Sequence, residues 1–143
     1  MVYQTKMQVV VQEELTGCGI AAVANIVGKS YADMKFIANE MGIYADDKSL
    51  WSETRYVRQL LSTMGYVVSE GEANFESWAD LPDIALLAIK HHQEAGKDFW
   101  HWVTFKRIDG HDYVFDSASY LLSNIRTDFE IMQPKWFIEV VNT

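Results

Sequence analysis

The chain has 143 residues, of which 49% are hydrophobic and 22% charged, a composition typical of one globular domain that can bury its own core. Its 20 acidic residues outnumber the 12 basic ones, and the formal net charge of −8 disfavours nucleic-acid binding, which depends on basic side chains that neutralise phosphates. The one cysteine excludes an internal disulfide and suits a reducing compartment, or a thiol that is kept free for chemistry. We therefore expect a single domain over residues 1–143.

No apolar run in the sequence approaches the roughly 20 residues that a membrane span requires. The apolar stretch Met7–Val11 is too short for a signal peptide, and acidic residues follow it at once. It is a candidate short strand or an extended lead-in to the domain. These features predict a soluble, cytoplasmic protein without membrane insertion, with export by a route that lacks a cleaved signal as the alternative.

The first half of the chain has the hydrophobic pattern of helices. Residues 18–28, CGIAAVANIVG, are apolar on nearly every face and predict a central, buried helix that ends at the glycine. Ser30 and Asp33 resemble a capping box, which predicts a second helix over residues 31–41.

A polar loop and a third helix are predicted between Ala45 and Met64. Ser49 or Ser52 is the expected N-cap of this helix. Apolar residues recur at helical spacing up to Met64, and Gly65 follows as the stop signal.

The second half of the chain has the pattern of strands. Asp109-Gly110 is a strong signal for a two-residue hairpin turn. The stretch Glu70–Asp83 contains five acidic residues and no basic one, and predicts a solvated loop. Helices followed by mostly antiparallel strands favour a segregated α+β domain. The predicted strands cover residues 66–68, 84–89, 102–107, 113–115 and 136–141.

Cys18 opens the first predicted helix, where unpaired amides and the positive end of the helix dipole stabilise a thiolate. Gly17 and Gly19 are expected to leave the backbone beside the sulfur uncrowded for a substrate carbonyl. The Cys18 amide is a candidate oxyanion donor, and the side-chain amide of Gln12, on the preceding turn, is a candidate second donor. The segment therefore carries a candidate nucleophile and a candidate oxyanion hole.

His101 and Asp116 are a candidate general base and the acid that orients it. If Asp109-Gly110 are the two central residues of the turn, Ile108 faces His111, and the side chains of His101 and Asp116 lie on one face of the hairpin. They are then diagonal neighbours, about 7–8 Å apart at the backbone, a gap that long side chains bridge. A three-residue loop would shift the register and separate them.

Several short motifs follow one another along the chain: Gln12, Gly17-Cys18-Gly19, Ala21-Ala22, His101-Trp102-Val103 and Val114-Phe115-Asp116. Their order resembles that of the papain-like cysteine peptidases, and most closely that of the bacteriocin-processing, double-glycine leader peptidases. The resemblance implies a papain-like α+β fold, in which N-terminal helices pack on a C-terminal, mostly antiparallel sheet. By position it implies that Cys18 is the nucleophile and Gln12 the oxyanion glutamine. It likewise implies that His101 is the general base and that Asp116 orients it.

Two positions depart from the family pattern: Gly17 stands where the family often has aspartate, and Ser117 where it often has proline. The resemblance implies a cysteine-dependent amide hydrolase, a peptidase that acts on a peptide or protein through a Cys-His-Asp triad, without a cofactor. One alternative is a papain-like protein glutamine deamidase, which would use the same groups. Another is a catalytically inactive domain that binds peptides or a protein partner. The oligomeric state is left open.

Each candidate residue also has a plain structural interpretation. Cys18 could be a small core residue at a helix start, and Gln12 a surface side chain. His101 lies between two tryptophans and could be a packed core histidine, and Asp116 could begin a turn. The combination of all four residues in this order favours the catalytic interpretation.

Other polar and aromatic residues are given structural roles or a place beside the site. The adjacent His91-His92 would point to opposite faces of a strand and lack a second pair of ligands, so no metal site is predicted. Asn25 is expected to be a buried amide that the backbone satisfies. Trp100 is the tryptophan expected to line a substrate groove, and most of the others are expected to pack in the core.

Overall fold

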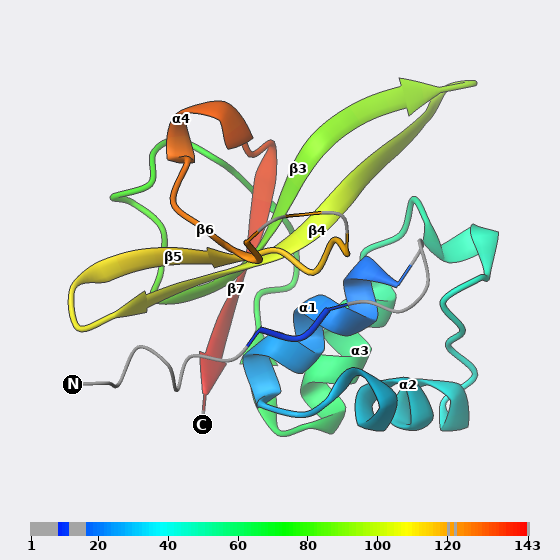
Figure 1. Ribbon diagram of the computed structural model, residues 1–143. Coiled ribbons are helices and arrows are strands. Elements are labelled where there is room, and N and C mark those ends of the chain that lie inside the picture. The colour runs from blue at the N-terminus through cyan, green and yellow to red at the C-terminus, as the bar shows by residue number, and fades with distance from the viewer. Residues whose placement is uncertain (1–8, 12–16, 120, 122, 143) are drawn as a thin grey trace.

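The computed structural model describes residues 9–11, 17–119, 121 and 123–142 (Figure 1). Three helices lie together on one side of an antiparallel sheet, which confirms the predicted α+β class. Within the ranges described, no helix has both the length and the apolar composition needed to cross a membrane. The helices are α1 (Cys18–Val27), α2 (Tyr31–Glu40), α3 (Arg55–Thr63) and the short α4 (Phe129–Met132).

The described residues form a seven-stranded sheet with the order β1-β7-β3-β4-β5-β6, and β2 pairs with β7 beside this path. Every pairing is antiparallel. Both hairpins that join β3, β4 and β5 connect neighbours in the sheet, whereas β7 returns from the end of the chain to lie between β1 and β3. The strands are β1 (Tyr66–Val68), β2 (Ala73–Asn74), β3 (Ile84–Glu94), β4 (Lys97–Ile108), β5 (His111–Phe115), β6 (Ile125–Arg126) and β7 (Trp136–Asn142).

The first half of β3 is buried on both faces, which explains its continuous apolar sequence. Leu86 and Ala88 belong to the core between the sheet and the helices. The alternate residues Ala85, Leu87 and Ile89 belong to a second core on the opposite face, which α4 and the loop before β3 help to cover. The sheet therefore separates two apolar clusters, and side-chain alternation assigns each residue of β3 to one of them.

Helix α1 is the central helix that the sequence predicts. Its residues from Gly19 to Ile26 are all buried, and it ends where Gly28 adopts a left-handed conformation with φ of 80°. The hydroxyl of Thr104 on β4 donates to the carbonyl oxygen of Ala22 across 2.8 Å in the buried interface. This contact fixes the helix against the strand that carries His101.

The second helix is confirmed with its cap, because the Ser30 hydroxyl accepts from the Asp33 amide at 3.1 Å. The predicted N-cap of the third helix is wrong. Ser49 lies in a 3₁₀ turn whose cap is Asp47, and α3 begins only at Arg55. The carboxylate of Asp47 binds both the amide and the hydroxyl of Ser49, so that serine is used in a separate turn.

The hairpin between β3 and β4 is longer than the sequence pattern predicts. Residues from Lys90 to His101 extend both strands, with a two-residue turn at Ala95-Gly96. A register shift between Ile89 and His92 breaks the alternation, and Lys90 has a positive φ of 55° there. Because this part of the hairpin is polar and its alternation is broken by the bulge, its sequence does not have the pattern of a strand. The two-residue strands β2 and β6 and the four-residue α4 are also absent from the prediction.

Candidate active site

Cys18 is the first residue of α1, and its half-buried side chain faces a pocket of about 200 Å³. The first amides of a helix have no intrahelical acceptor, and they make this position favourable for a thiolate. His101 lines the same pocket, where its side chain interacts with that of Cys18. The other residues that line the pocket are aromatic: Trp51, Tyr56, Phe99, Trp100 and Trp102.

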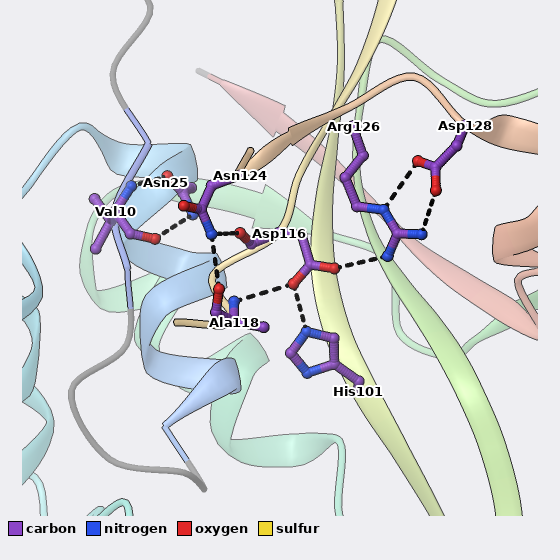
Figure 2. Close-up of polar contacts among 8 residues, drawn as sticks. All are labelled: Val10, Asn25, His101, Asp116, Ala118, Asn124, Arg126 and Asp128. Carbon is purple, nitrogen blue, oxygen red and sulfur yellow. Dashed lines mark hydrogen bonds and ion pairs between the residues drawn. The ribbon is translucent and has the colours of Figure 1, made fainter. Parts of the chain in front are cut away.

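The hairpin that carries His101 has the predicted turn and register. Ile108 pairs with His111, and the central residues Asp109 and Gly110 both have positive φ, as a type I′ turn requires. The same register continues to the pair Thr104 and Phe115 at the end of β5. The predicted common face is therefore confirmed, and His101 Nε2 lies 2.7 Å from Asp116 Oδ1 (Figure 2).

Asp116 is fully buried, with a side-chain exposure of 0%. Besides His101, its Oδ1 accepts from the Ala118 amide at 3.1 Å, and its Oδ2 lies 3.0 Å from Nη1 of Arg126. Arg126 in turn holds Asp128 through two nitrogens, at 3.0 and 2.6 Å. Figure 2 shows Arg126 between the two carboxylates. A buried carboxylate with these partners stays ionised at low cost.

The loop after Asp116 is closed by a second set of hydrogen bonds. The side-chain amide of Asn124 donates to the carbonyl oxygens of Asp116 and Ala118, at 2.7 and 2.8 Å. The Asp116 amide donates to the Asn124 carbonyl at 2.8 Å, which continues the pairing of β5 with β6. The backbone of Asp116 is thus fixed on both sides of its side chain.

The pKa values of His101 and Asp116 shift in opposite directions. Burial alone lowers the pKa of His101, but its hydrogen bonds and charge interactions with Asp116 and Cys18 outweigh burial and raise that pKa to about 9. Burial raises the pKa of Asp116, but the hydrogen bond and charge of His101, with the Ala118 amide and Arg126, lower it to about 2. The pair is therefore an imidazolium and a carboxylate around neutral pH.

Tyrosine hydroxyls fill the space beside the two glycines that flank Cys18. A Cβ at Gly17 would lie 2.1 Å from the Tyr31 oxygen, and a Cβ at Gly19 would lie 2.1 Å from the Tyr56 oxygen. The expectation that these glycines leave open space for a substrate is therefore wrong: they make room for tyrosines. Burial, together with the charge of Cys18, raises the pKa of Tyr56, so that its hydroxyl stays neutral.

Asn25 has the backbone-satisfying role that the sequence predicts. Its Oδ1 accepts from the Val10 amide at 2.7 Å, and its Nδ2 donates to the Val10 carbonyl at 3.3 Å. Residues 9–11 are therefore held on α1 by this pair and do not form a strand. The rest of the predicted lead-in and the candidate oxyanion residue Gln12 lie outside the described residues, so the role of Gln12 stays a prediction.

His91 and His92 lie in the β3–β4 hairpin and pair with nearby carboxylates. His91 Nε2 lies 3.0 Å from Asp98, and His92 Nε2 lies 2.9 Å from Glu94. Among the described residues, no group of three or more histidine, cysteine or acidic side chains is placed to hold a metal ion. Trp100 lines the pocket as predicted, and Trp102, which is buried, lines it as well.

Five residues of this region have no site role in the sequence prediction: Trp51, Tyr56, Phe99, Asn124 and Arg126. Trp51 and Tyr56 come from the region before and within α3, and no local pattern relates them to Cys18. Arg126 lies on a strand of only two residues, too short to be recognised from alternation. The only feature of the sequence that could have indicated its role is that it is a basic residue close in sequence to Asp116 and Asp128.

Comparison with models of protein families gave no match, and neither did comparison with curated protein sequences. Solved structures do match. One is a double glycine motif protease from an AMS/PCAT transporter, in complex with its leader peptide, with a TM-score of 0.60 and 16% identity over 95% of this chain and 91% of that one. Another is the peptidase domain of Streptococcus ComA, a bifunctional ABC transporter of a quorum-sensing pathway, with a TM-score of 0.55 and 13% identity over 96% of this chain and 99% of that one.

The chain has the papain-like fold of these double-glycine peptidase domains. The similarity covers nearly the whole length of both compared domains, so the helices and the sheet are shared as one unit. This confirms the predicted fold and the predicted resemblance. At 13–16% identity the similarity concerns the fold, and the chemistry of this chain has to be argued from its own side chains.

Proposed function

We propose that the protein is a cysteine peptidase in which Cys18 is the nucleophile, His101 the general base and acid, and Asp116 the residue that orients His101. The observation that carries this proposal is the arrangement of three groups: Cys18 at a helix N-terminus and His101 line one pocket, and His101 Nε2 lies 2.7 Å from the buried Asp116. A thiol nucleophile requires this order of groups.

In the proposed mechanism each nitrogen of His101 has a distinct task. Because Nε2 lies on Asp116, Nδ1 is the nitrogen that is available to the sulfur. Transfer of the thiol proton to Nδ1 gives a thiolate and an imidazolium, and the buried carboxylate stabilises that imidazolium. The high pKa of His101, about 9, favours the ion pair in the resting protein.

In the proposed reaction the Cys18 sulfur attacks the carbonyl carbon of a peptide bond, and the carbonyl oxygen becomes an oxyanion. The Cys18 amide and the side chain of Gln12 are the proposed oxyanion donors. His101 then gives its proton to the leaving nitrogen, which breaks the C–N bond and leaves a thioester. A water that gives a proton to His101 attacks the thioester, and the acid product and the free thiol are released.

The proposed substrate is an extended peptide. The pocket is lined mostly by flat aromatic side chains, and Cys18 in it is only half-buried, which suits a peptide chain that passes over the thiol. The protease from the AMS/PCAT transporter is bound to a leader peptide in its solved structure. We extend that class of ligand, a peptide segment, to this chain.

Mass spectrometry of a peptide library after incubation with the protein tests this function. Wild type is expected to produce new peptide termini, and Cys18→Ser is expected to produce none. An increase of about 1 Da on glutamine without chain cleavage would replace the peptidase by a deamidase that uses the same groups. Peptide binding without any mass change, equal in wild type and Cys18→Ser, would contradict an enzymatic function.

A further inference from the structure

Arg126 occupies a place that the proposed reaction does not explain. It lies on β6, which pairs with β5 in a register that sets Val114 opposite Arg126 and Phe115 opposite Ile125. Asp116 follows one residue later, and its backbone continues the ladder to Asn124. Since side chains alternate, Arg126 and Asp116 lie on one face as diagonal neighbours.

Asp116 therefore has a diagonal partner on each side. His101 on β4 contacts Oδ1 at 2.7 Å, and Arg126 on β6 contacts Oδ2 at 3.0 Å. The two contacts use different oxygens, so the guanidinium does not compete with the imidazole. With both oxygens engaged, rotation of the carboxylate about its Cβ–Cγ bond would break both ion pairs.

Arg126 is itself fixed in place. Asp128 accepts from Nε and Nη2, which leaves Nη1 directed at Asp116 (Figure 2). The side chain of Arg126 is only 14% exposed, whereas Asp128 is 43% exposed. A planar fork held on one side by Asp128 can offer a single, directed donor to a buried carboxylate on the other.

The charges of this cluster favour an imidazolium at His101. Two carboxylates, Asp116 and Asp128, and one guanidinium, Arg126, leave a formal charge of −1. A proton on His101 brings the cluster to neutrality. Without Arg126, the buried Asp116 would have only the imidazole as a cationic partner, and protonation of the carboxylate would become easier.

We propose that Arg126 is a positioning residue of the site, which fixes the Asp116 carboxylate in the orientation that His101 uses. This inference rests on the proposed function and adds a fifth side chain to the four already proposed, Cys18, His101, Asp116 and Gln12. Arg126 does not touch the sulfur or the reacting carbonyl, and it acts through Asp116 alone. Its loss should therefore be visible in how the Cys18 thiolate responds to pH.

The test is the rate of Cys18 alkylation by iodoacetamide as a function of pH, read by mass spectrometry. The titratable and charged groups that face the site are His101 on β4, Asp116 after β5, Arg126 and Asp128 at β6, Tyr56 on α3 and Tyr31 on α2. In Arg126→Gln the acidic limb of the rate–pH curve is expected to shift its midpoint upward by up to about 1 pH unit. The loss of one adjacent opposite charge raises the pKa of Asp116 by about 1–3 units, and only part of that change reaches the thiol through His101. Arg126→Lys keeps the positive charge, and its acidic limb is therefore expected to lie close to the wild-type position.

Arg107→Gln is the matched control. Arg107 is a comparably buried arginine, 23% exposed, which binds Asp112 and the carbonyl oxygens of Leu81 and Trp78 away from the site. Its loss is expected to lower thermal stability without moving the acidic limb. Should Arg126→Gln fail to fold, Asp128→Asn is the second variant, because it frees the guanidinium from its anchor and should move the limb by a smaller amount in the same direction.

An acidic limb at the wild-type position in Arg126→Gln, or in Asp128→Asn where only that variant folds, would overturn the role of Arg126 and leave the peptidase proposal intact. An unreactive thiol in wild type itself would overturn the proposed function, and the role of Arg126 with it. The wild-type curve therefore separates the two failures.

Discussion

His101 and Asp116 are joined across two adjacent strands, with Nε2 of the histidine 2.7 Å from Oδ1 of the aspartate. The contact depends on a two-residue turn at Asp109-Gly110, because a slip of one residue would turn Asp116 to the other face of the sheet. The turn at the far end of the hairpin therefore brings Asp116 to Nε2 of His101, and Nδ1 is left for Cys18.

The first prediction concerns the stability that the buried carboxylate provides. Asp116 has a pKa of about 2 in the folded protein and an ordinary value of 3.8, so its contribution is present above about pH 4 and is lost as the pH falls towards 2. At pH 6, Asp116→Asn is expected to lower the free energy of unfolding by about 2 kcal/mol. Denaturant titrations at pH 6 and pH 3 should show the difference between wild type and variant becoming smaller at the lower pH. A difference that stays constant would contradict the pKa shift.

The second prediction separates thiolate reactivity from catalysis at high pH. His101 has a pKa of about 9, and the proposed reaction needs its proton for the leaving nitrogen. Peptide hydrolysis is expected to fall above about pH 9, whereas alkylation of Cys18 should not fall, since it needs only the thiolate. Parallel measurements of the two rates from pH 6 to pH 10 check this. A fall of both rates together would contradict the assignment of His101 as the acid.

The third prediction concerns the tyrosine that fills the space at Gly19. Gly19→Ala places a methyl group against the ring and hydroxyl of Tyr56, and such overpacking costs about 1–3 kcal/mol. Thermal unfolding should show the loss, and Tyr56→Phe in the same protein should recover part of it by removing the nearest atom. Gly71→Ala is the control, because a Cβ there meets no described atom within 4 Å. Equal effects of the two alanines would contradict the packing described.

The fourth prediction concerns the segment that precedes Cys18. Asn25→Leu removes the side chain that satisfies both the amide and the carbonyl of Val10. The expected loss is about 1–3 kcal/mol of unfolding free energy, the usual effect of leaving buried polar groups without their partner. Limited proteolysis should also cleave the variant more readily before Cys18 than wild type. Wild-type stability together with wild-type resistance would show that the pair does not anchor the segment.

Much of the fold can be predicted from the sequence because the patterns that determine its helices and turns are local. The apolar run from Cys18 to Gly28, the cap at Ser30 and the hairpin turn at Asp109-Gly110 each determine an element without distant partners. The pairing of His101 with Asp116 follows from the turn alone, by counting along two strands. The start of α3 is missed because Asp47 binds Ser49 in a separate turn.

The parts of the site that the sequence does not reveal come from long-range contacts. Tyr56 reaches the first turn of α1 from another helix, and Arg126 reaches Asp116 from a strand of two residues. Neither contact can be predicted from a periodic pattern or a fixed spacing in the sequence. The catalytic role of Gln12, the cytoplasmic location, the extent of the domain and the absence of nucleic-acid partners stay predictions.

The most direct test of the central claim is the pH dependence of Cys18 alkylation by iodoacetamide in wild type and in His101→Ala. An ordinary cysteine thiol has a pKa of about 8.5. The account predicts that wild-type Cys18 reacts well below that pH and that His101→Ala, verified as folded by circular dichroism, loses this reactivity. A thiol that is inert in the folded protein, or that titrates in the same ordinary way in both proteins, would contradict an activated Cys18–His101 pair.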